Sequence, residues 1–248
     1  MKLQLNRAAV IVLFAAASFF TSCKSYNVAS RYTSKYINAN TGKVSAQVPE
    51  TFELGYTMLA LTDLAQTDTT IINKNTAYYH ELMAWFNKYK DHKGVRHLNA
   101  DLNRNANMIK CYLDGLYAFQ LNDGRVALKT SYRIDLNKVD FKRYALLLQN
   151  FYKETNFHEF YTQHQGMYAD MVQRANGMFN YNEMQKGIST QANGYQVVLS
   201  PLINAYAGTM QIKGHTYNEC IVFPRMSTNG LSYAFKENIA IDNKSKAY

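Results

Sequence analysis

Three side chains suited to polar chemistry stand close together in one stretch of the chain, residues 156–177. His164 lies one helical turn from both Tyr161 and Tyr168, so a helix would present the imidazole and the two phenols on one face. An imidazole titrates near neutral pH, so this set is the best candidate for acid–base chemistry if it faces a cleft. The alternative, which we favour, is a core histidine hydrogen-bonded to a tyrosine.

The same histidines raise the question of a zinc site. A zinc-binding helix of the His-Glu-x-x-His type needs two histidines four residues apart on one face. His80 and His158 are each followed by a glutamate, but Ala84 and Thr162 occupy the fourth positions. His164 falls six residues after His158, which turns it to a different face of a helix. No two of the six histidines are four residues apart, so we assign no metal site: they stand at positions 80, 92, 97, 158, 164 and 215.

One long helix over residues 156–177 is expected to position the candidate groups. Asn156 followed by Glu159 matches a capping box at its start, and Asn176-Gly177 supplies a left-handed turn at its end. Its apolar and aromatic residues recur at helical spacing and would form a stripe facing the core: Phe157, Phe160, Tyr161, His164, Tyr168, Met171 and Val172.

Further helices are expected before this one, and strands after it. Apolar periodicity predicts earlier helical segments: residues 52–64, whose first part could instead be a strand, 76–90, 99–120 and 139–152. Composition and turn residues predict short strands: residues 126–136, 195–199, 210–212, 216–217, 219–223 and 231–235. This order indicates an α+β fold, with a helix-rich N-terminal part followed by a small, mostly antiparallel sheet.

Residues 1–22 match a bacterial export signal. Lys2 and Arg7 form a basic start, and the apolar run from Ala8 to Phe20 has the length of a secretory signal. The segment Phe20-Thr21-Ser22-Cys23 resembles a lipobox, in which the signal is cut before a cysteine that becomes lipidated. Phe20 stands where leucine is commoner, so secretion without a lipid is the alternative. We expect lipidation at Cys23, with acyl chains that hold the protein to a membrane.

Residues 23–49 are expected to be a flexible tether, and residues 50–248 a single α+β domain. The tether contains four basic residues and no acidic one, which suits a segment near an anionic membrane surface. Without the two basic residues of the signal, 25 of the 27 basic residues remain against 18 acidic ones, a formal charge of +7. The chain shows neither zinc-finger spacing nor a phosphate-binding loop, so nucleic acid is not an expected partner.

Cys111 and Cys220 are the two cysteines besides Cys23. In an oxidising compartment they could form a disulfide, but their separation in the sequence does not decide it. Both stand among apolar residues, a setting that disfavours the thiolate and therefore a cysteine nucleophile.

Several aromatic-rich segments, together with the lipoprotein start, resemble an uncharacterised family of bacterial lipoproteins typical of Bacteroidetes: YYHELMAWFNKYKDHKGV, NFHEFYTQHQGMYADMV and YQVVLSPLINAYAG. Members of that family look like zinc metallopeptidases of the zincin type. The resemblance implies that residues 50–223 form the N-terminal portion of such a fold, possessing a sheet that lines a peptidase cleft. It also implies a His-Glu-x-x-His helix downstream of the strands, and the sequence reaches Tyr248 without one. Zinc would be a cofactor only if a further C-terminal segment supplied that helix.

Three functions remain open. The first is a metallopeptidase-like lipoprotein that is inactive as it stands because the zinc helix is missing. The second is a non-catalytic envelope lipoprotein that binds peptide or glycan through its aromatic side chains. The third is a hydrolase of another class using His164 or His215, but no Gly-x-Ser-x-Gly elbow supports it. We expect the protein at the periplasmic face of the outer membrane, with a peptide or protein as the substrate class that the resemblance implies.

Overall fold

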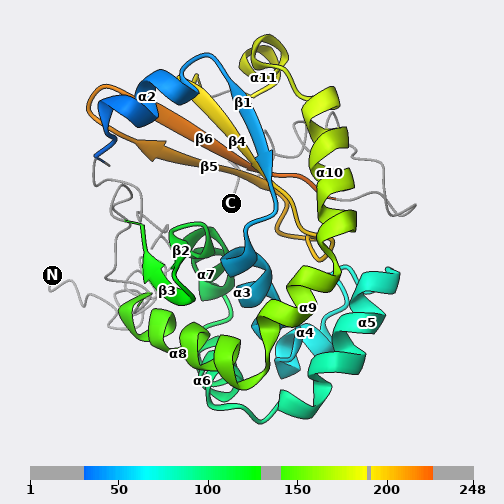
Figure 1. Ribbon diagram of the computed structural model, residues 1–248. Helices are drawn as coiled ribbons and strands as arrows, with labels where there is room; N and C mark the ends of the chain where they lie inside the picture. Colours follow the sequence, from blue (N-terminus) through cyan, green and yellow to red (C-terminus); the bar gives the residue numbers. More distant parts are fainter. Residues whose placement is uncertain (1–30, 130–140, 189–190, 226–248) are drawn as a thin grey trace, which may run out of the picture.

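A computed structural model describes residues 31–129, 141–188 and 191–225 (Figure 1). This part of the chain forms a four-stranded sheet at one end and a group of helices at the other, so the predicted α+β class is confirmed. The export signal, Cys23 and the strand expected at residues 231–235 lie outside the described residues. Within the described ranges, no helix is both long and apolar enough to cross a membrane.

The main sheet has the strand order β1-β4-β6-β5. Its strands have the following bounds: β1 Val44–Gln47, β4 Gly194–Val198, β5 Gly208–Lys213 and β6 Asn218–Phe223. β5 and β6 form an antiparallel hairpin, but β4 runs parallel to both β1 and β6. The expectation of a mostly antiparallel sheet is therefore wrong for these four strands. All five residues of β4 are buried, as is usual for a central strand with parallel neighbours.

The expected tether contains part of the fold. Thr33 caps a helix, α2 (Ser34–Asn40), by accepting a hydrogen bond from the backbone N–H of Tyr36. The next strand, β1, adds to the sheet edge with Val44 opposite Tyr195. The folded domain thus begins before residue 50. A pairing over such a sequence distance leaves no local pattern, which is why the polar composition of this segment suggested a tether.

The helical group is built around α3 (Glu50–Ala60), in which every residue after Glu50 is buried. Such a helix, apolar on nearly all sides, belongs in the interior. The predicted helix over residues 99–120 is divided, because the chain leaves the helical path at residues 105–107 and enters a strand at Phe119. The surrounding elements are α4 Asp63–Thr67, α5 Ala77–Phe86, η2 Asn87–Tyr89, α6 Lys93–Arg104, α7 Met108–Leu116, β2 Phe119–Asn122, β3 Arg125–Leu128 and α8 Phe141–Glu154.

The long helix expected over residues 156–177 is two helices, α9 (Phe157–Gln163) and α10 (Gln165–Met178). The chain bends between them at His164, whose φ and ψ are −98° and 5°. This bend lets α9 stay in the helical group while α10 continues along β1 (Figure 1). A short helix, α11 (Tyr181–Gly187), then leads into β4.

Both predicted ends of that helix differ from the structure. Asn156 has a left-handed backbone, with φ of 54°, and its side-chain amide donates to the Glu159 carboxylate instead of accepting a backbone N–H. Gly177 lies inside α10 and is not among the residues with positive φ, so no left-handed turn ends the helix there. The helix continues one residue further and ends where Phe179 becomes extended.

Candidate functional site

A buried chain of hydrogen bonds links three helices at the centre of the molecule. The hydroxyl of Tyr78, on α5, lies 2.7 Å from Oε2 of Glu53 on α3 and 2.8 Å from the hydroxyl of Tyr168 on α10. Glu53, Tyr78 and Tyr168 are 0%, 4% and 2% exposed. One predicted candidate, Tyr168, is therefore part of a polar cluster, and the cluster has an acid at its inner end.

Glu53 is an acid held in an apolar place. Burial raises the pKa of its carboxyl to about 7, even though hydrogen bonding from Ser200 and Tyr78 opposes the shift. The Ser200 hydroxyl acts from nearby, but no hydrogen bond of normal geometry to a described residue reaches Oε1 of Glu53. Glu53 therefore takes up a proton near neutral pH, much more readily than an exposed glutamate does.

The two tyrosines stay neutral over the same range of pH. Burial and the neighbouring Glu53 carboxylate raise the pKa of both the Tyr78 and the Tyr168 hydroxyl well above the usual value. When Glu53 is ionised, Tyr78 donates to its Oε2 and is left to accept from Tyr168. When Glu53 carries a proton, the order of donation can reverse, because each hydroxyl both donates and accepts. The hydrogen-bonded chain can thus accommodate Glu53 in either protonation state.

His164 lies beside this chain, at the bend between α9 and α10. Its Nδ1 lies 2.7 Å from the carbonyl oxygen of Phe160, and its Nε2 lies 2.9 Å from Oε2 of Glu81. Both nitrogens face acceptors, so both hydrogen bonds form together only when the imidazole is doubly protonated. The ring also packs edge-on against Tyr78 at 5.1 Å between centroids. We expected His164 to be a core histidine hydrogen-bonded to a tyrosine. The tyrosine partner is wrong, because the two hydrogen bonds of His164 go to a carbonyl and a carboxylate.

Tyr161, the third candidate, contributes mainly its ring. It packs on Tyr168 with centroids 4.8 Å apart, and its hydroxyl donates to the carbonyl of Val48 at 2.6 Å. The structure thus brings the predicted residues Tyr161, His164 and Tyr168 together. Their polar atoms, however, meet partners within the protein, so the geometry resembles a structural network more than a reaction centre.

The other histidines of the described ranges do not assemble into a metal site. His92 pairs with Glu154 at 3.0 Å, His97 with Asp101 at 3.3 Å and His158 with Glu50 at 2.8 Å: three separate pairs in three places. His92 also accepts from the backbone N–H of Gly94 and so caps α6. Among the described residues, no three His, Cys, Asp or Glu side chains lie where they could hold one metal ion.

Glu53 and Tyr78 are the members that sequence reasoning missed. Glu53 stands in an apolar helix, and an acid at a core position is a signal that could have been used. Tyr78 stands three residues before Glu81 on α5, so the two side chains lie on one helix face and meet Tyr168 and His164 respectively.

The cysteines do not pair in the way considered from the sequence. Cys220 is buried in β6 and takes no part in a disulfide, so the disulfide between Cys111 and Cys220 is not formed.

The chain was also compared with known proteins. No family model, no curated protein and no solved structure matches it. The resemblance to a zincin-like lipoprotein family therefore stays a prediction.

Proposed function

We propose that the protein is an exported lipoprotein of the cell envelope, anchored through Cys23 at the periplasmic face of the outer membrane. Its folded domain, on this proposal, acts by binding and not by catalysis. The observation that carries the proposal is the N-terminal sequence, in which a basic start, an apolar run and Phe20-Thr21-Ser22-Cys23 occur in the order that lipoprotein export requires.

The central cluster supports the non-catalytic part of the proposal. A catalytic acid or base must reach the substrate within hydrogen-bond distance, directly or through one water. Glu53, Tyr78 and Tyr168 are buried, and His164 has its two nitrogens occupied by Phe160 and Glu81. The known partners of these groups thus favour a scaffold over a reacting site. A peptide or a glycan remains the ligand class that the abundant tyrosines suit best.

The anchor would hold the domain close to the membrane. Seven residues separate Cys23 from Arg31, where the described part of the chain begins. An extended chain of that length spans at most about 30 Å. The lipid and the folded domain would then be less than one domain diameter apart, so the domain surface near Arg31 would stay in reach of the lipid headgroups.

The test of the anchor is the intact mass of the protein purified from the membrane of a bacterium that processes lipoproteins. We expect a chain that begins at Cys23 and carries acyl groups, and a Cys23→Ser variant that lacks them and leaves the membrane fraction. The matched control, Cys111→Ser, should keep the lipid. A thioether at Cys23 and a disulfide from Cys23 to Cys111 exclude each other. An acyl-free mass two hydrogens below the reduced chain would therefore contradict the proposal.

A second experiment tests the binding role against the peptidase-like alternative. The mature protein is titrated with zinc by calorimetry and incubated with unfolded casein as a general peptidase substrate. The proposal expects no stoichiometric tight binding of zinc and no cleavage. Tight binding of one zinc ion per chain, together with cleavage that a chelator stops, would favour the metallopeptidase reading instead.

A further inference from the structure

One face of α8 carries unpaired cations around an exposed leucine. Lys142, Leu146, Gln149 and Lys153 follow one another at spacings of four, three and four residues, which places them on one stripe of the helix. Leu146 is 61% exposed, a large value for a leucine of a folded domain. We call this stripe, together with Arg125 of the adjacent strand β3, the α8 face.

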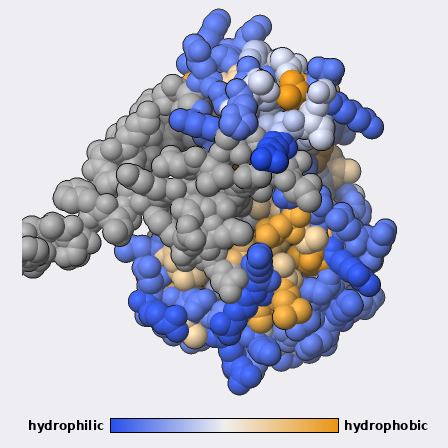
Figure 2. All heavy atoms as spheres, turned by 90° about the vertical axis from the view of Figure 1, so that its left-hand side faces the viewer, coloured by the Kyte–Doolittle hydropathy of each residue, from blue (hydrophilic) through white to orange (hydrophobic). Residues whose placement is uncertain are grey.

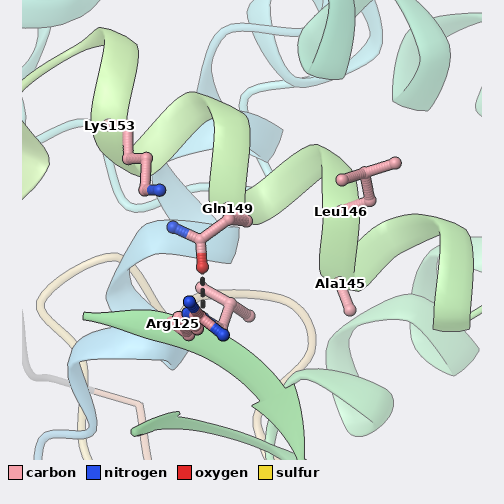
Figure 3. A pocket seen from close by; sticks show the side chains of 6 residues that line it. Arg125, Ala145, Leu146, Gln149 and Lys153 are labelled. Atoms are coloured by element: carbon pink, nitrogen blue, oxygen red, sulfur yellow. Dashed lines mark hydrogen bonds between the residues drawn. The ribbon is translucent and has the colours of Figure 1, made fainter. Parts of the chain in front are cut away.

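A shallow hollow lies between α8 and β3 on this face. Arg125 and Lys153 stand at its rim, and Val126, Ala145 and Leu146 give it apolar walls (Figure 3). Gln149 holds the two elements together, because its Oε1 accepts from the backbone N–H of Val126 at 2.6 Å and its Nε2 donates to the carbonyl of Gly124 at 3.1 Å. The hollow is thus a fixed feature of the helix and the hairpin.

Within the described ranges, no acidic side chain pairs with the basic residues of this face. The side chains of Arg125, Lys142 and Lys153 make no ion pair or hydrogen bond with any other residue in the described ranges. The acids nearest in sequence are Asp123 in the hairpin turn, Asp140, which lies outside the described residues, and Glu154, which is engaged with His92. An anionic partner would therefore meet three cations with which no described residue pairs.

β3 and the start of α8 lie on the side of the molecule where the described chain begins. The start of α2, the strand β3 and the start of α8 are all on the left in Figure 1. Figure 2 shows that side, with an apolar area bordered by hydrophilic residues in its lower half. A membrane that carries the lipid of Cys23 would approach the domain from this side.

We propose that the α8 face docks onto the anionic phospholipid headgroups of the membrane that holds the anchor. Arg125, Lys142 and Lys153 would lie among the phosphates, and Leu146 would enter the headgroup layer. A single anchoring device holds a protein weakly, whereas acyl chains and a basic patch together hold it firmly and fix its orientation. The orientation rests on the proposed lipidation of Cys23, but the affinity of the face for lipid does not.

The test uses the mature chain from residue 23 with Cys23→Ser, which carries no lipid, and measures its sedimentation with vesicles. We expect binding to vesicles of phosphatidylcholine mixed with phosphatidylglycerol, weakening with added salt, and far less binding to phosphatidylcholine alone. Reversing all three charges, in Arg125→Glu/Lys142→Glu/Lys153→Glu, should lower the partition coefficient by at least about tenfold, since each basic residue near an anionic surface contributes roughly a fivefold gain.

The matched control reverses three exposed lysines elsewhere and so changes the net charge equally: Lys88→Glu/Lys90→Glu/Lys186→Glu. It should bind much more strongly than the α8-face variant. Leu146→Gln, which leaves the charge unchanged, should lose affinity as well. Equal binding by the two triple variants, with both folded by circular dichroism, would overturn the proposal, and so would equal binding to neutral vesicles. Neither outcome bears on the mass measurement at Cys23, so the two proposals fail separately.

Discussion

Tyr78 donates a 2.7 Å hydrogen bond to Oε2 of Glu53, and this bond joins the interior helix α3 to α5. It is the only hydrogen bond of normal geometry that the described residues make to this carboxyl group. A fully buried acid with so little support is costly when ionised, because water has been replaced by apolar side chains. The stability of the domain should therefore depend on pH through the titration of Glu53.

The first prediction concerns Glu53→Gln and the pH dependence of stability. The pKa of the carboxyl rises from its ordinary value of about 4.3 in the unfolded chain to about 7 in the folded one. Between these values the folded state holds a proton that the unfolded state has lost, so the free energy of unfolding falls as pH rises. The stabilisation that comes from this retained proton is complete below about pH 4 and lost above about pH 7.

The free energy of unfolding of the wild type should thus fall by roughly 2 to 3 kcal/mol between about pH 5 and pH 8, whereas that of Glu53→Gln should fall much less. Urea unfolding followed by the fluorescence of Trp85, the single tryptophan, measures both. Glu183→Gln is the control, since Glu183 is exposed and forms no ion pair with a described residue, so this change should leave the slope unchanged. Parallel pH profiles for wild type and Glu53→Gln would show that Glu53 does not titrate in this range.

The second prediction concerns Tyr78→Phe, which removes the donor and keeps the ring. The decrease in the free energy of unfolding should be larger at about pH 8, where Glu53 is ionised and needs the donor, than at about pH 5, where Glu53 is neutral. Leaving a buried charged group without its hydrogen bond costs about 1 to 3 kcal/mol or more, so the pKa of Glu53 should rise further. Tyr161→Phe, which removes a hydroxyl bonded to the carbonyl of Val48, is the control. Its cost should not change with pH.

The fold class followed from local patterns, whereas the site did not. Helical periodicity and β-rich runs predict most of the elements, because each burial pattern belongs to a single segment. Glu53, Tyr78 and Tyr168 come together only through the packing of α3, α5 and α10, which are distant in sequence. The parallel pairing of β1 with β4 is hidden for the same reason. Local signals also failed at Asn156, where the amide turns to the Glu159 carboxylate instead of a backbone N–H.

The third prediction compares His164→Ala with His158→Ala. Each imidazole pairs with a glutamate, but the side chain of His164 is 12% exposed and that of His158 is 65% exposed. His164→Ala removes a packed ring and the hydrogen bond to the carbonyl of Phe160 at the bend, and should cost roughly 2 to 3 kcal/mol. His158→Ala should cost less than about 1 kcal/mol, as exposed ion pairs do. Equal losses in urea unfolding would show that the bend does not depend on His164.

The last prediction uses two glycines that face opposite surroundings. Gly177 lies in α10 with open space around it, so Gly177→Ala should stabilise the domain by about 0.5 to 1 kcal/mol because alanine suits a helix better. A methyl group on Gly115 would overlap the ring of Phe141, which packs α8 against α7, so Gly115→Ala should cost about 1 to 3 kcal/mol. Thermal unfolding of both variants measures the two signs. The sequence pattern had placed Gly177 in a left-handed turn, where alanine is strained. Destabilisation by Gly177→Ala would therefore indicate that the left-handed turn is present and that α10 ends before it. Stabilisation would support the helix that continues to Met178.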